Sequence, residues 1–111
     1  MYSSSATLNS STTAYTTTGE VTGTNYTAGG NALTNQGAST SGTTAYTDFA
    51  DCTFTNVTIT ARYGLIYNST ESNKAVAVLD FGSDKIATAQ NFNVIFPAVG
   101  ASTAIIQITE N

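Results

Sequence analysis

The chain has 111 residues, enough for one domain with a single modest core, and 41% of them are hydrophobic. It contains no His, no Trp and one Cys, and only 9% of its residues are charged. Side chains that act as catalytic acids, bases or metal ligands are therefore scarce, and we expect no enzyme, no cofactor and no metal site. A net charge of −4 with three basic residues argues against nucleic acid and anionic membranes as partners.

The N-terminal part of the chain is polar. Residues 1–45 are rich in Thr, Ser and Gly and have few large aliphatic side chains, so they cannot form a core on their own. We expect an extended arm with loops here, with disorder in the first dozen residues. Residues 1–5 show no basic stretch followed by an apolar run, so we expect no secretory signal and synthesis in a cytoplasm.

Tyrosines are spread through this polar part at Tyr2, Tyr15, Tyr26 and Tyr46. Each can bury its ring while the hydroxyl stays wet, so each is a candidate anchor for an extended segment. The pair Gly29 and Gly30 has no Lys and no helix beside it, which favours a tight turn with positive φ over a phosphate-binding loop.

Residues 57–63 alternate apolar and polar side chains with the period of a half-buried strand. This pattern places Val57, Ile59, Ala61 and Tyr63 on the inner face. Gly64 interrupts it, which predicts a bulge or bend before the strand resumes. Arg62 falls on the outer face, where we expect its stem to cover apolar surface and its head to pair with an acid of a neighbouring strand.

Residues 68–73 predict a polar turn, and the run 75–79 is typical of a strand buried on both sides. We expect this strand to be the centre of the core and Gly82 to Asp84 to end it. Asp80 and Asp84 are too few and too irregularly spaced for a calcium loop. Their expected role is to accept hydrogen bonds from backbone donors in the turn.

The C-terminal part contains two further predicted strands. Phe92, Val94 and Phe96 alternate with polar or outward positions before Pro97 ends the strand, and residues 104–108 form the last one. Cys52 is expected to pack as a small buried hydrophobe without a redox role. The sequence thus predicts a single all-β domain, an antiparallel β-sandwich of jelly-roll or similar type over residues 46–111, with residues 1–45 as its extended segment.

Three blocks of sequence together resemble a family of short virion-associated structural proteins of tailed bacteriophages. They are residues 19–33 (GEVTGTNYTAGGNAL), 60–68 (TARYGLIYN) and 77–84 (AVLDFGSD). The resemblance covers most of the chain, and the blocks occur in the family's order. Members usually have Gly where this chain has Asn25, and Asn tolerates left-handed backbone geometry as well.

The resemblance implies a capsid decoration or cement protein that sits on the virion's outer capsid surface. Its implied partners are the major capsid protein and other copies of the chain, with a trimer favoured, and no catalytic residues come with it. We expect assembly contacts at Tyr15, Tyr26, Gly29, Gly30, Tyr46 and Arg62, and we expect a chain without residues 1–30 to keep a folded core but lose particle binding.

Other functions stay open at this point. One is a fibre, spike or tail-tip module that binds a receptor, and another is a head-tail connector or tail-tube subunit. The last is a free carbohydrate-binding or hydrolytic β-domain, because fold alone does not decide function.

Overall fold

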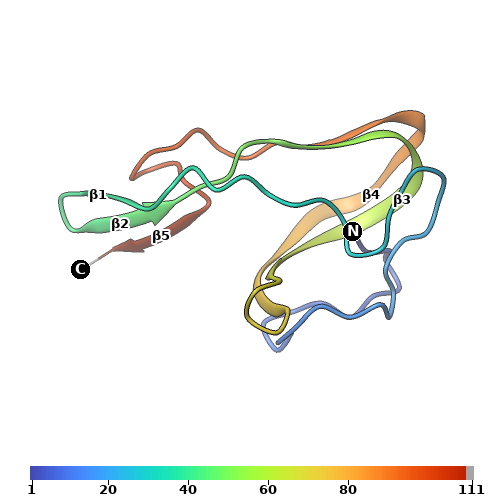
Figure 1. The fold of residues 1–111 in the computed structure, drawn as a ribbon, viewed down its shortest axis with the longest axis horizontal. Coiled ribbons are helices and arrows are strands. Elements are labelled where there is room, and N and C mark those ends of the chain that lie inside the picture. Colours follow the sequence, from blue (N-terminus) through green and yellow to red (C-terminus); the bar gives the residue numbers. More distant parts are fainter. Residues whose placement is uncertain (110–111) are drawn as a thin grey trace. The chain divides into compact units, whose positions relative to one another are not determined.

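The computed structural model describes residues 1–109, which form strands and no helix. The strands form two antiparallel sheets, with the order β1-β2-β5 in one and β3-β4 in the other. The predicted all-β, antiparallel class is thus confirmed, and the sheets do not close into a barrel. Within the described range no helix is long and apolar enough to cross a membrane. The strands are β1 (Ser39–Ser41), β2 (Thr44–Thr47), β3 (Cys52–Asn68), β4 (Lys74–Val94) and β5 (Ile106–Thr109) (Figure 1).

The chain divides into two compact units. The first combines Met1–Gly30 with Phe54–Phe92, and the second combines Asn31–Thr53 with the residues from Asn93 onward. This division differs from the boundary expected after residue 45. Composition marks the first residues as a polar arm, but it does not reveal the backbone hydrogen bonds that attach them to β3.

β3 supplies half of the buried hydrophobic side chains described in the first unit. Val57, Ile59 and Ala61 are at most 3% exposed, while the threonines between them face solvent. The predicted alternation over 57–63 is therefore confirmed in this stretch. Before Val57 the buried side chains belong to even-numbered residues of β3. The change to odd-numbered residues occurs at Asn56, whose φ is 50°.

A β-bulge changes the inward face a second time. Arg62 and Tyr63 lie opposite one residue, Tyr2, and their amides donate to its carbonyl at 2.8 and 3.1 Å. The amide of Tyr2 returns a hydrogen bond of 2.8 Å to the carbonyl of Tyr63. Two residues against one is the pattern of a bulge, so the interruption predicted at Gly64 is present just before it. The strand then continues with Ile66 buried.

β4 is not the doubly buried strand that the run 75–79 predicts. Val76 is 49% exposed, and the side chains after it are only half-buried. The prediction was wrong because β4 belongs to a two-stranded sheet, and burial of both faces of a strand requires other elements packed against each face. The strand also does not end at Gly82, which takes a φ of 82° within it, and it continues to Val94.

The polar turn predicted at 68–73 joins β3 to β4. The side-chain oxygen of Asn68 accepts hydrogen bonds from the amide and the hydroxyl of Thr70 at 3.0 and 2.7 Å. Ser72 and Asn73 have φ values of 55° and 58°. These left-handed residues reverse the chain before Lys74 begins the next strand.

The first residues of the chain are folded, which corrects the disorder expected for them. Tyr2 is 1% exposed and pairs with both Glu20 and Tyr63 in isolated antiparallel bridges. Its hydroxyl donates to the carbonyl of Thr16 at 2.6 Å, and Val21 is also buried. Deletion of residues 1–30 would remove these buried side chains, and the expectation that the core folds without them stays a prediction.

The second unit contains the three-stranded sheet. β2 lies in the middle, with Tyr46 opposite Ser39 of β1 on one side and Gln107 of β5 on the other. The last strand begins at Ile106, slightly later than predicted. Phe96 is buried, as its alternation predicts. Its amide donates to Asp51 at 2.8 Å, and its ring lies 5.7 Å from that of Phe49.

Candidate functional site

Glu20 is the centre of a hydrogen-bonded cluster in the first unit. Its carboxylate accepts hydrogen bonds from the hydroxyl of Tyr15 at 2.7 Å and from the hydroxyl of Tyr26 at 2.9 Å. The amide of Gly29 is a third donor, at 2.7 Å. The amino group of Met1 donates to the Tyr26 hydroxyl at 2.8 Å. Three donors from separate positions thus converge on one acidic side chain, and Met1 joins the cluster through the Tyr26 hydroxyl.

Aromatic stacking holds the two tyrosine rings in place. Tyr15 stacks on Tyr67 with ring centroids 4.9 Å apart, and Tyr26 stacks on Phe54 at 5.6 Å. The hydroxyl of Tyr67 donates to the carbonyl of Gly29 at 2.8 Å. Contacts of this kind add about 1 kcal/mol to the burial of the rings, so the cluster joins the N-terminal segment to β3.

The turn at Gly29 and Gly30 has the geometry expected from the sequence. Their φ values are 92° and 78°, in the left-handed region that glycine adopts without strain. This conformation aims the amide of Gly29 at Glu20. The turn therefore belongs to the Glu20 cluster.

The phenols of the cluster are hydrogen-bond donors near neutral pH. The hydrogen bond to Glu20 raises the pKa of Tyr15 to about 12, with burial as a lesser cause. Burial, followed by the hydrogen bond to Glu20, raises the pKa of Tyr26 still further. A group suited to proton transfer has a pKa near the working pH, so this arrangement favours a structural or binding role for these phenols.

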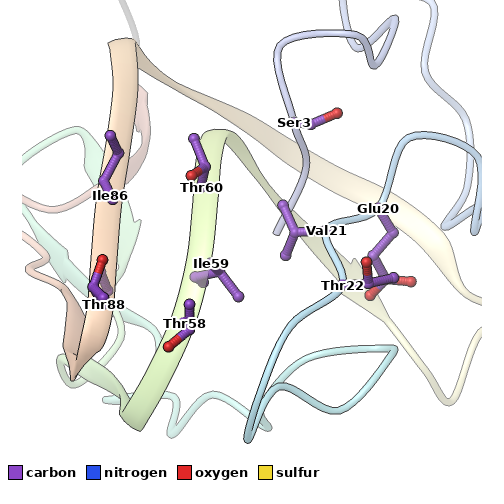
Figure 2. Close-up of a pocket in the computed structure, with 10 residues that line it drawn as sticks. Ser3, Glu20, Val21, Thr22, Thr58, Ile59, Thr60, Ile86 and Thr88 are labelled. Carbon is purple, nitrogen blue, oxygen red and sulfur yellow. The ribbon is translucent and has the colours of Figure 1, made fainter.

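A groove lies beside the cluster. Its volume is about 440 Å³, within the usual range for binding sites. Figure 2 shows the N-terminal segment on one side, β3 along the middle and Ile86 and Thr88 of β4 on the far side. Hydroxyl groups, short apolar side chains and one carboxylate line it: Ser3, Glu20, Val21, Thr22, Thr58, Ile59, Thr60, Ile86, Ala87 and Thr88.

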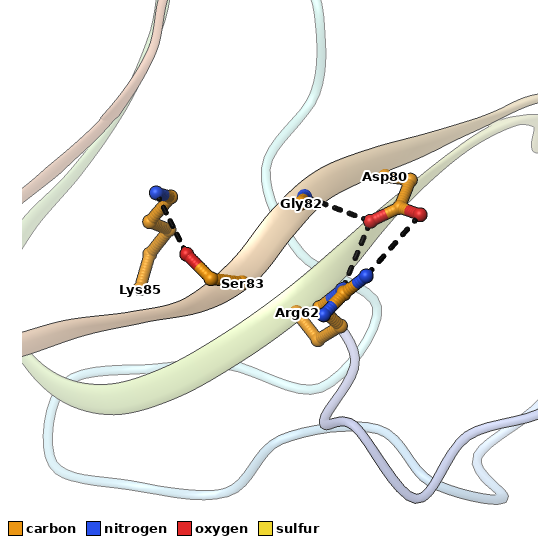
Figure 3. A network of polar contacts seen from close by, with 5 residues as sticks. All are labelled: Arg62, Asp80, Gly82, Ser83 and Lys85. Carbon is orange, nitrogen blue, oxygen red and sulfur yellow. Dashed lines mark hydrogen bonds and ion pairs between the residues drawn. The ribbon is translucent and has the colours of Figure 1, made fainter.

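Arg62 pairs with Asp80 across β3 and β4, as predicted (Figure 3). Nε of Arg62 lies 2.9 Å from one carboxylate oxygen of Asp80, and the terminal nitrogen lies 3.5 Å from the other. The amide of Gly82 also donates to Asp80 at 2.8 Å, which is the backbone role expected for this acid. Both interactions lower the pKa of Asp80, the arginine more than the amide.

The structure brings together most of the sequence-predicted contact residues. Four of them lie around Glu20: Tyr15, Tyr26, Gly29 and Gly30. A Cβ added at Gly30 would lie 3.8 Å from the Tyr26 hydroxyl. Tyr46 lies in the other unit, on β2. The contacts of these residues with a partner chain stay a prediction, because their observed contacts are within the chain.

Sequence reasoning missed Glu20 as the centre of the cluster. It is the first charged residue of the chain, and the next one is Asp48. The sequence does contain a signal for this cluster, because Glu20 is a single acid in a long uncharged stretch and lies between Tyr15 and Tyr26. Tyr67 was also missed, because its place in the cluster depends on how the N-terminal segment lies along β3.

Cys52 and Asp48 are the buried thiol and the buried carboxylate of the described residues. Cys52 is a buried free thiol, as predicted, and burial raises its pKa. Within residues 1–109 no three acidic or thiol side chains gather closely enough to hold a metal ion. Asp48 is fully buried, and one of its carboxylate oxygens has no hydrogen-bond partner while the other accepts from the amide of Phe49.

No protein-family model, curated protein or solved structure matches this chain.

Proposed function

We propose that this chain is a structural protein of a bacteriophage virion, a capsid decoration or cement protein that binds the outside of the major capsid lattice and stabilises the head. Its partners are the major capsid protein and other copies of itself, assembled as a trimer. In this role it catalyses no reaction and uses no cofactor, nucleic acid or membrane.

The observation that carries the proposal is the exposure of large β-branched side chains. Three of the seven isoleucines, Ile86, Ile95 and Ile108, are 71%, 69% and 73% exposed. Apolar surface left open on a small chain supports contact with other protein surfaces. A decoration protein needs many such contacts, each weak, which lattice symmetry multiplies.

Strand edges offer a second kind of contact. Among the described residues, β5 lies at one edge of its sheet, and β4 pairs with β3 and, at its start, with Ala14 through an isolated bridge to Lys74. The free main-chain groups of an edge strand can pair with an extended segment of another chain. Such pairing needs no charged anchors, which suits a chain with so few of them.

Cryo-electron microscopy of particles produced by the genome that encodes the chain tests the proposal. Density for this chain over the capsid lattice, joining neighbouring capsomers at symmetry axes, is the expected result. Density at the tail tip would support a receptor-binding module instead, and a ring at the neck or along the tail would support a connector or tube subunit. Absence of the chain from the particle would overturn a virion role.

A further inference from the structure

The groove coincides with an interruption in the pairing along the outer edge of β3. On one side of it, the amide of Thr58 donates to the carbonyl of Thr24 at 3.2 Å. On the other side, the amide of Arg62 donates to the carbonyl of Tyr2 at 2.8 Å. Thr60 lies midway, and the alternation of an antiparallel strand directs its N–H and C=O groups to this same edge.

The main chain of Thr60 has no partner on that edge. Among residues 1–109, no hydrogen bond joins it to the N-terminal segment, and Thr60 lines the groove (Figure 2). An open donor and acceptor between two paired positions can receive an extended segment of polypeptide. Ile86, which is 71% exposed, offers that segment apolar contact, and Glu20 gives the groove a carboxylate with no basic side chain in its lining.

One exposed segment of this chain has the complementary chemistry. Residues 83–86 of β4 are all exposed. Ile86 is 71% exposed, and the ammonium group of Lys85 donates to the hydroxyl of Ser83 at 3.0 Å (Figure 3). The segment therefore carries a β-branched apolar side chain next to a lysine whose flexible stem lets its charge reach a carboxylate nearby.

We propose that the groove is a contact between copies of this chain, in which residues 83–86 of one copy lie along Thr60 of another. The main chain of the incoming segment pairs with Thr60, its Ile86 packs on the exposed Ile86 that lines the receiving groove, and its Lys85 faces the carboxylate of Glu20. The inference rests on the self-association in the proposed function and not on binding to a capsid.

The two halves of this contact lie close together on one chain. Ile86 belongs to the incoming segment and also lines the groove of its own copy. Each copy can therefore offer its segment to one neighbour and receive the segment of another. A head-to-tail contact of this type forms a closed ring, such as the proposed trimer, where the rotation between copies closes, and an open filament where it does not.

Sedimentation equilibrium of the purified full chain, compared across matched variants, tests the proposal. Ile86→Asp and Lys85→Glu change the incoming segment, and both side chains are exposed, so the fold is retained. Val99→Asp and Lys74→Glu are the controls, because they place the same charges at exposed positions outside the groove. We expect the unchanged chain to self-associate, the groove variants to dissociate at least about tenfold more readily, and the controls to differ by less than about twofold.

The amide of Thr60 provides a readout within the groove itself. Its hydrogen exchange should be fast in dilute protein and slower by about tenfold or more at concentrations where the chain associates. Thr60→Pro removes an N–H that has no partner among residues 1–109, and it also fixes φ near about −65°. Circular dichroism therefore checks first that β3 is kept, and the folded variant should associate weakly.

The outcomes distinguish self-association of the chain from the groove contact. A chain that stays monomeric at all concentrations would overturn both self-association and the groove contact. An oligomer that the groove and control variants weaken equally, or whose formation leaves Thr60 exchange unchanged, would overturn the groove contact alone.

Discussion

The rings of Phe81 and Phe92 lie 6.0 Å apart although both belong to β4 and eleven positions separate them. Eleven residues of straight strand span about 36 Å, so β4 must bend back toward itself, as Figure 1 shows for β3 and β4 together. Gly82 and Ala89, between the two rings, have φ values of 82° and 49°. These left-handed residues interrupt the extended path, and the bend lets a two-stranded sheet enclose apolar side chains.

The first prediction concerns the aromatic contact across this bend. Phe92 is buried, so Phe92→Ala should lower the free energy of unfolding by about 3 kcal/mol. Combined with Phe81→Ala in a double-mutant cycle, it should show a coupling of about 1 kcal/mol. Urea unfolding measures both quantities. Ile95→Ala, at an exposed position, is the control and should change stability by less than about 0.5 kcal/mol; additive Phe effects would refute the contact.

The second prediction concerns Gly23, where the N-terminal segment crosses β3. A Cβ at this position would lie 1.8 Å from the carbonyl oxygen of Thr58, and a backbone oxygen cannot move aside without disturbing the strand. Gly23→Ala should therefore destabilise the chain by about 3 kcal/mol or more. Gly37→Ala is the comparison, since its Cβ meets nothing within 4 Å and only its φ of 88° opposes the change, at a cost of about 1 kcal/mol. Equal thermal shifts for the two variants would contradict this account.

The third prediction concerns the pH dependence of the Glu20 cluster. Because the pKa of Tyr15 rises to about 12 in the folded chain from about 10 in the unfolded one, its hydrogen bond stabilises the fold fully below pH 10. That stabilisation is lost as the pH rises from about 10 through about 12. The free energies of unfolding of the unchanged chain and of Tyr15→Phe should thus differ by about 1 kcal/mol at pH 8. The difference should disappear above about pH 12. A difference that persists at high pH would assign the effect to packing.

The extent to which sequence predicts this fold depends on whether a feature is local. The alternation along Val57, Ile59 and Ala61 records burial directly, so β3 was predictable. The exposure of Val76 was not predictable, because an apolar run looks the same in the sequence of a central strand and of a strand in a two-stranded sheet. Glu20 is a similar case: its neighbours in the cluster come from separate parts of the chain, and spacing alone does not bring Tyr67 to Gly29.

The fourth prediction concerns the surface pair of Arg62 and Asp80. The pKa of Asp80 is lowered by the arginine and by the amide of Gly82, so the stabilisation is present above the usual Asp pKa of about 4 and is lost as the pH falls below it. Because the pair is exposed, Asp80→Asn should have a small effect that added salt reduces further. Chemical unfolding at low and high ionic strength checks this, with Asp84→Asn as the control; a large effect that salt leaves unchanged would contradict it.

The last prediction concerns the thiol of Cys52. It is buried in the second unit, and burial raises its pKa, so both access to the sulfur and the fraction of reactive thiolate are low. An aromatic disulfide reagent at pH 8 should modify the folded chain at least about 100-fold more slowly than the urea-unfolded chain. Because modification then requires opening of the second unit, its rate should rise with added urea. Phe92→Ala, a change in the first unit, should alter the rate much less. A folded chain that reacts as quickly as the unfolded one would show that Cys52 is accessible and that its surroundings are not packed.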